Sequence, residues 1–404
     1  MTGSLLSDTM RDWADEAAVP PDLADRALHV RGFRGRSQGL RRHGIAVPLV
    51  AGLATAAVVV AGLAVGGTWG PRHGSGVTSA AGLDLRADLG DQPPQRLVAA
   101  GAVAVGAVYT TRLGPIPGST WSTMHYRWSV VDPGSGTYRP TDWAWVSVAP
   151  GLDRAAVLEG PLPASRIGIV DTRTGEVTRW ITTDHPVASV AWSPTSDELV
   201  ATAYESDPDQ QMSEGKDAFR MRQVERSGFV LADATAGTAT FHAVPASTDW
   251  PSSRNDFSWT LDGTRVWEQK AGDARMAFFD LTGAPAQRDD VSAYDGNIGT
   301  TSASMSRVSP DGRFRFSIDS GIPTQITDTK TGATYRQQAL QLLAWADDEH
   351  VIALAGCEQP CTGTAEFRNQ LVVMRYDGTD VVPLTGRRTG DNSWSFALAM
   401  RDAP

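Results

Sequence analysis

Aspartates recur at comparable positions in the part of the chain that follows residue 90, and three belong to near copies of one Thr-Asp-Trp or Thr-Asp-His motif. Carboxylates that a repeating fold gathers around one point attract cations, and their oxygens are ligands that divalent metal ions prefer. We therefore predict a site for a cationic ligand, with a divalent cation as one candidate and no other cofactor. In the alternative interpretation each aspartate only caps its own turn. The candidate ligand-binding residues are Asp142, Asp184, His185, Asp249, Asp295 and Asp391.

Signs of catalysis are few. The four histidines after residue 90 are widely separated, without the close spacing of zinc ligands. After residue 90 the chain has no GxSxG nucleophile motif, no HExxH helix motif and no phosphate-binding loop. We therefore predict no catalytic residue. A metal-dependent hydrolase, with Asp184 and Asp249 as ligands and His185 as the base, is the enzymatic alternative.

The two cysteines, Cys357 and Cys361, frame the short segment CEQPC. A disulfide between them would persist if this part of the chain lies outside the cytoplasm. Closing so short a loop adds little chain-entropy stabilisation, so the predicted bridge would mainly shape the tip of a loop. Two free thiols or a redox pair are the alternatives.

The positions of these residues depend on a repeat. An apolar run that ends in aspartate and leads into a glycine-containing turn occurs six times, at intervals of about 40 to 60 residues. A second apolar run with a tight acidic turn precedes most of these copies. Each period therefore supplies four strands, which is typical of a β-propeller blade. The aspartates that end the runs are Asp132, Asp171, Asp233, Asp280, Asp328 and Asp377.

The fold class predicted from this pattern is all-β, a six-bladed β-propeller. The apolar segment 393–399 resembles an inner strand without partners, whereas the segments near residue 96 resemble a blade that lacks its inner strand. Pairing of these two ends would complete one blade and remove the open edges of the ring. We expect the aspartate of each turn to accept hydrogen bonds from backbone N–H groups.

The segments VSPDGRFRF and WSPTSDELVA resemble the repeats of TolB-like and WD40-like β-propellers, and the resemblance covers residues 96–400. It implies the architecture and leaves the activity open, because propellers serve many functions. Five tryptophans fall in the predicted inner strands, where we expect them to pack between blades: Trp145, Trp192, Trp259, Trp345 and Trp394.

The predicted turns divide into short and long ones. In a propeller the long connections 113–123, 160–165, 205–226 and 356–368 would share one face. Variable loops on a rigid scaffold commonly carry recognition. We therefore predict that a protein or peptide partner binds this long-loop face.

Residues 45–67 carry no charge, and a helix of about 23 residues spans the hydrocarbon core of a membrane. Arginines crowd the segment before it, which predicts a cytoplasmic N-terminus. The predicted organisation is a short helical or disordered cytoplasmic tail over 1–44, a transmembrane helix over 45–67, a linker over 68–92 and a propeller over 93–402. A cleaved signal peptide and a buried soluble helix are the alternatives.

The net charge of −10 argues against a nucleic-acid partner, because phosphate contacts require a basic face. The function predicted is that of a single-pass membrane protein whose extracytoplasmic propeller is a non-catalytic binding module. The layout also resembles actinobacterial membrane-anchored regulators, including anti-sigma factors, which implies a regulator that contacts a cytoplasmic partner through residues 1–30. No cysteine precedes residue 357, so the zinc-binding pattern of many anti-sigma domains is absent.

Overall fold

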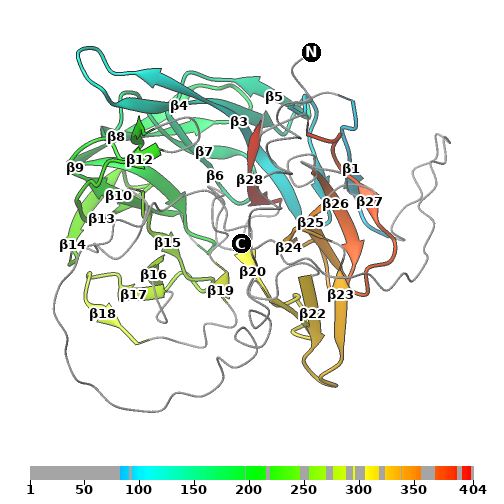
Figure 1. Ribbon diagram of the computed structural model, residues 1–404. Helices are drawn as coiled ribbons and strands as arrows, with labels where there is room; N and C mark the ends of the chain where they lie inside the picture. Colours follow the sequence, from blue (N-terminus) through cyan, green and yellow to red (C-terminus); the bar gives the residue numbers. More distant parts are fainter. Residues whose placement is uncertain are drawn as a thin grey trace, which may run out of the picture. The chain divides into compact units, whose positions relative to one another are not determined.

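The computed structural model describes residues 82–90, 93–195, 197–214, 219–245, 254–269, 276–287, 294–295, 305–317, 324–337, 339–355, 369–388 and 394–401. They belong to one compact unit, Leu49–Pro404, and form antiparallel sheets joined by turns (Figure 1). The all-β prediction is confirmed for these residues. Within these ranges we find no helix with the length and hydropathy needed to cross a membrane. The predicted tail and membrane segment, 1–67, lie outside them.

The first sheet joins the two ends of the described chain. The C-terminal strand β28 pairs antiparallel with β3, with Ser395 opposite Tyr109 and Met400 opposite Val103 (Figure 1). This is the pairing that we expected from the sequence. The first seven residues of β3 are buried, and β3 pairs with β28 along this stretch. The strands are β1 (Leu85–Arg86), β2 (Ala99–Ala100), β3 (Val103–Pro115), β4 (Ser122–Asp132), β5 (Thr137–Pro140), β11 (Gln210–Ser213), β12 (Phe219–Met221) and β28 (Ser395–Met400).

The second sheet has seven strands in the order β14-β13-β10-β9-β8-β7-β6. Its long strand β9 pairs with β8 through its first half and with β10 through its second half. Residues 183–186, which hold the Thr-Asp-His copy of the motif, lie within β9. They are not opposite any residue of β8 or β10, yet the backbone stays extended. The strands are β6 (Trp145–Val148), β7 (Arg154–Leu158), β8 (Ala164–Asp171), β9 (Val177–Trp192), β10 (Glu198–Tyr204), β13 (Arg226–Asp233) and β14 (Thr238–Ala243).

Four smaller antiparallel sheets follow along the chain. The first contains β15 (Ser258–Trp259), β16 (Arg265–Gln269), β17 (Met276–Asp280) and β18 (Pro285–Ala286), and the second contains β19 (Tyr294–Asp295) and β20 (Met305–Ser306). The third contains β21 (Phe314–Ser317), β22 (Thr324–Asp328) and β23 (Thr334–Gln337). The last contains β24 (Gln341–Trp345), β25 (His350–Ala355), β26 (Gln370–Arg375) and β27 (Val382–Pro383).

The six aspartates that end the repeated apolar runs all accept backbone hydrogen bonds in the turns that follow them, as predicted. In the turn after β22, Asp328 Oδ1 accepts from the N–H groups of Lys330 at 2.9 Å and Thr331 at 3.0 Å. Gly332 follows with a φ of 74°, a conformation that side chains disfavour. The turn chemistry is therefore local and repeats with the sequence pattern.

The five tryptophans of the predicted inner strands are all buried. Three of them donate their indole N–H to a backbone carbonyl of an earlier strand or the segment after it. The bonds run from Trp192 to Ser147 at 2.8 Å, from Trp259 to Ala191 at 3.1 Å, and from Trp345 to Arg307 at 2.9 Å. These rings thus join successive strands of the repeat by a directional bond as well as by burial.

Candidate functional site

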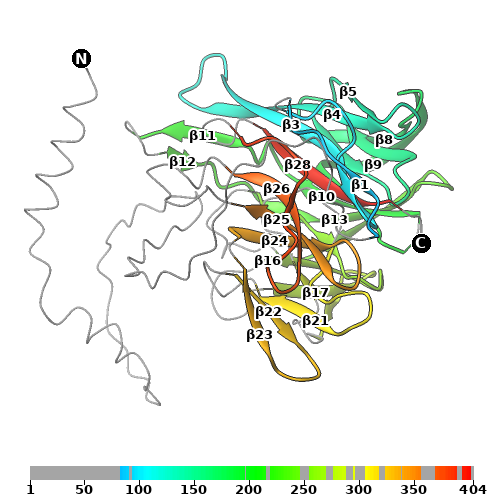
Figure 2. The ribbon, with the colours of Figure 1, turned by 90° about the vertical axis from the view of Figure 1, so that its right-hand side faces the viewer.

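Two of the long connections come together in one sheet. The strand β11 lies in the connection 205–226, and it pairs with β4 at the end of the β3–β4 hairpin (Figure 2). Gln210 stands opposite Thr123, and the Thr123 hydroxyl donates to Asp207 at 2.5 Å. The N–H of Met124 donates to the carbonyl of Asp209 at 3.1 Å. Segments about 85 residues apart therefore form one extension of the first sheet.

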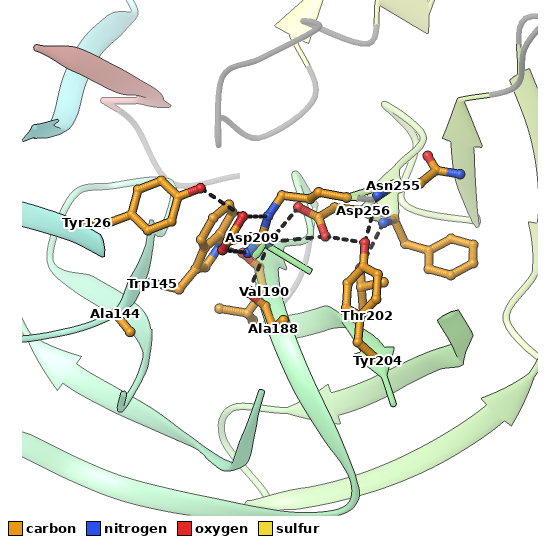
Figure 3. Close-up of polar contacts among 12 residues, drawn as sticks. Tyr126, Ala144, Trp145, Ala188, Val190, Thr202, Tyr204, Asp209, Asn255 and Asp256 are labelled. Atoms are coloured by element: carbon orange, nitrogen blue, oxygen red, sulfur yellow. Dashed lines mark hydrogen bonds and ion pairs between the residues drawn. The ribbon is translucent and has the colours of Figure 1, made fainter. Parts of the chain in front are cut away.

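Arg254 fixes the base of this extension. Its Nε donates to Asp209 Oδ1 at 2.8 Å and its Nη2 to Oδ2 at 2.5 Å, so the pair is bidentate. Its Nη1 donates to Asp256 Oδ2 at 3.0 Å and to the carbonyl of Ala188 at 3.1 Å. The Asp209 side chain is 6% exposed and that of Arg254 is 15% exposed. Figure 3 shows the two carboxylates meeting at this point.

Aromatic side chains enclose the ion pairs. The guanidinium of Arg254 lies over the Trp145 ring, 4.3 Å from its centroid. The Tyr126 hydroxyl donates to Asp209 at 3.1 Å, and the Tyr204 hydroxyl donates to Asp256 at 3.0 Å (Figure 3). Charged groups that are desolvated in this way interact more strongly than exposed ones. The Arg254 network, defined as Arg254, Asp209, Asp256, Tyr126, Tyr204 and Trp145, thus joins β4, β6, β10 and two connections.

The charge states in the Arg254 network follow from burial and from the neighbouring charges. Burial and the charge of Asp209 raise the pKa of Tyr126 well above its usual value. Burial and the charge of Asp256 do the same to the pKa of Tyr204. Burial alone would lower the pKa of Arg254, but the two carboxylates outweigh it and leave that pKa raised. The tyrosines and the arginine therefore keep their protons at neutral pH. They act as hydrogen-bond donors that stabilise the structure, and not as groups that transfer a proton.

A second buried ion pair lies beside the Arg254 network. Arg226, at the start of β13, donates through Nη1 to Glu268 near the end of β16, and both side chains are almost fully buried. Asn255 Nδ2 donates to the same carboxylate at 2.8 Å. The backbone N–H of Asn255 donates to the hydroxyl of Tyr204 at 2.7 Å, which connects the two clusters. This pair fastens the end of the long connection 205–226 to the next sheet.

The structure describes four of the six predicted ligand-binding residues, and they lie on three different segments. Asp142 is exposed, follows β5 and lines a cavity that is described below. Asp184 is exposed within β9, and the ring of His185 stacks on Phe241 with centroids 3.5 Å apart. Asp295 belongs to the short strand β19. Asp249, Asp391, Cys357 and Cys361 lie outside the described residues.

The residues that the structure does bring together were not predicted from the sequence. Asp209 lies in the hydrophilic connection 205–226, which the sequence marked only as a long loop. Arg254 and Asp256 follow the predicted Asp249 by a few residues, as an arginine and an acid two positions apart. In the described part of the chain, no group of three or more His, Cys, Asp or Glu side chains has the arrangement of a metal site. The cation in the Arg254 network is supplied by the chain itself.

Comparisons with known proteins give distant structural similarity only. No family model matches the chain, and no curated protein matches its sequence. Hydrazine synthase from Kuenenia stuttgartiensis is 13% identical with a TM-score of 0.32, over 60% of this chain and 66% of that one. TolB from Acinetobacter baumannii is 15% identical with a TM-score of 0.36, over 73% of this chain and 66% of that one. The chain thus spans slightly less than two thirds of the length of these two structures.

A third solved structure is the Cps50 (Swd1) β-propeller domain from Myceliophteria thermophila. It is 12% identical with a TM-score of 0.34, over 73% of this chain and 90% of that domain. The chain is therefore distantly similar in structure to TolB and to WD40-like β-propeller domains.

Proposed function

We propose that this protein is a membrane-anchored, extracytoplasmic six-bladed β-propeller that binds a protein or peptide partner through its long-loop face. In this proposal β28 is the inner strand of the blade that contains β3, β4 and β5. The strand β9 ends one blade with its first half and begins the next with its second half. The charge-free segment 45–67 is the anchor.

One observation carries the proposal. Two of the four connections that would share the long-loop face, 113–123 and 205–226, contribute to one ordered sheet, because β11 pairs with β4 and the Arg254 network clamps the base. An ordered extension costs less conformational entropy on binding than a loose loop does. On β3, the Leu113 side chain of this extension is 46% exposed, which offers an apolar contact to a partner.

The test of the binding face is site-specific photo-crosslinking in cells that make the full chain. A photoreactive amino acid is placed at Leu113, on the extension, and as a matched control at Thr174, in the exposed short turn between β8 and β9. We expect a discrete crosslinked adduct from position 113 and none from position 174. Adducts of equal intensity at both positions, or none at position 113, would refute the assignment of the binding face.

The topology has its own test. Protease added to intact cells is expected to cut the connection 205–226, in which Glu205 and Arg222 are exposed, and to leave the tail 1–44 uncut. If the connection resists protease in intact cells and is cut only after lysis, the extracytoplasmic assignment is wrong. The crosslinking experiment is independent of this outcome, because it needs only a folded chain.

A further inference from the structure

A cavity of about 460 Å³ lies between the strands β4–β5 of the first sheet and β7–β8 of the second. This volume is within the range of about 300–1,000 Å³ that is usual for small-molecule sites. Part of its lining is apolar and small: Val130, Ala155, Val157 and Val170. None of the lining residues belongs to the Arg254 network, so this cavity is separate from the site described above.

Three ionisable side chains line the cavity, and two of them are already neutralised. Arg139 donates to Asp132 at 3.3 Å and to the backbone carbonyl of Arg173 at 2.7 Å. Glu159 accepts from the Nε of Arg166 at 2.8 Å. Arg139 and Glu159 therefore each have a partner of opposite charge, and only the third ionisable group can give the cavity an uncompensated charge.

The third ionisable group is Asp142, in the connection between β5 and β6. It makes no hydrogen bond or ion pair with any residue that the structure describes, and it is exposed. The cavity therefore presents one unbalanced carboxylate beside apolar walls.

An indole ring stands next to this carboxylate. Trp143 is half-buried, lines the cavity and packs at 6.0 Å and 68° against Trp180. A cation over an indole face gains electrostatic attraction from the ring. The chain already displays this chemistry beside the cavity, because Arg166 lies 3.8 Å over the Trp180 ring while it bonds to Glu159.

We propose that this cavity binds a small organic cation with an apolar body. The ammonium or guanidinium group pairs with Asp142 and lies against Trp143, and the apolar body enters the cavity between the two sheets. A neutral molecule of the same shape would leave Asp142 without a counterion, and an anionic one would be repelled. This site does not depend on the binding face proposed above.

The test is calorimetric titration of the purified full chain with a matched set of probes. Tryptamine carries the ammonium group, tryptophol replaces it with a neutral hydroxyl, and indole-3-acetate replaces it with a carboxylate. Phenethylamine and hexylamine extend the set of cations. We expect saturable binding of at least one of the three amines, with tryptophol weaker than tryptamine by about tenfold, since one charge-assisted bond is lost. Indole-3-acetate is expected to give no saturation.

Variants locate the site. Asp142→Asn should weaken amine binding by about tenfold and leave tryptophol unchanged. Trp143→Leu should weaken amine binding several-fold while it keeps an apolar wall. The matched control is Asp348→Asn, which removes the same charge from an exposed turn between β24 and β25 and should bind amines like the parent.

Three outcomes would overturn the proposal. These are no saturable binding of any of the three amines at millimolar concentration, equal binding of tryptamine and tryptophol, or amine affinity that Asp142→Asn does not change. If Asp142→Asn failed to fold, the comparison of tryptamine with tryptophol on the parent chain would still decide the matter. Failure here would leave the crosslinking prediction at Leu113 unaffected.

Discussion

Replacement of Arg254 by methionine removes the cation that joins Asp209 to Asp256 while keeping an apolar stem over Trp145. The Asp209 carboxylate would lose both of its bonds to the guanidinium and would keep the Tyr126 hydroxyl, 3.1 Å away. Because its side chain is only 6% exposed, water cannot easily replace the lost partner. The variant therefore leaves a buried, poorly compensated charge.

The magnitude follows from burial. Breaking a buried ion pair by removing one partner typically costs about 3–5 kcal/mol. For a domain of roughly 300 residues, that lowers the melting temperature by about 5–8 °C. A matched control is Arg86→Met, whose partner Asp84 is half-exposed. Exposed pairs of this kind are worth about 1 kcal/mol or less.

The assay is urea unfolding of Arg254→Met, of Asp209→Leu and of the double variant, with hydrogen exchange at Met124 as a local readout. The double variant should be more stable than the sum of the single losses predicts, since it leaves no unpaired charge on either side of that pair. The Met124 amide, which bonds to the Asp209 carbonyl, should exchange faster in Arg254→Met. A loss no larger than that of Arg86→Met would refute the view that this pair clamps the extension.

Three further predictions concern the repeat itself. Trp192→Phe keeps an aromatic ring but leaves a buried carbonyl without its indole partner, so urea unfolding should show a loss of about 1–3 kcal/mol. The Cβ added by Gly332→Ala would meet no atom within 4 Å, so this variant should lose about 1–2 kcal/mol of stability from its positive φ alone. A Cβ added at Gly101 would lie 2.1 Å from a backbone oxygen. Gly101→Ala should therefore lower the melting temperature much more than Gly332→Ala does. The Thr331 N–H holds the pKa of Asp328 below its ordinary 3.8. The ionised Asp328 carboxylate therefore stabilises the folded state fully at pH values above its unfolded pKa, and this stabilisation is lost as the pH falls through its lower folded pKa. The difference in the free energy of unfolding between the parent and Asp328→Asn should thus shrink below about pH 4. A difference that stays constant down to pH 2 would contradict this account.

The part of the fold that follows from local chemistry could be predicted from the sequence. An aspartate that accepts hydrogen bonds from the N–H groups of the next few residues forms its turn without any residue distant in sequence. The repeated aspartates therefore predict the positions of the turns. The inner-strand tryptophans are buried where the repeat expects them. At 183–186, however, the sequence resembles the neighbouring Thr-Asp-Trp motif, yet the backbone continues as one strand through unpaired residues. Residues 141–143, the Thr-Asp-Trp copy, lie between β5 and β6 outside any strand, so similar residues adopted different secondary structure.

The candidate site could not be predicted, because its contacts are non-local. Arg254 forms an ion pair with Asp209, 45 residues earlier in the chain, and its guanidinium lies over the ring of Trp145 in the second sheet. A sequence rich in arginine and acidic residues allows many pairings of this kind. Which of them form depends on how the connection 205–226 adds to β4, and no turn motif marks that pairing.

The pairing of β28 with β3 sets the order in which the chain can fold as it is made. The strand β28 leaves the ribosome about 15 to 60 seconds after β3 at ordinary rates of synthesis, because almost 300 residues separate the two strands. During that interval the apolar edge of β3 is open to other chains, because its native cover does not yet exist. Deletion of β28 would leave this edge of β3 permanently unpaired.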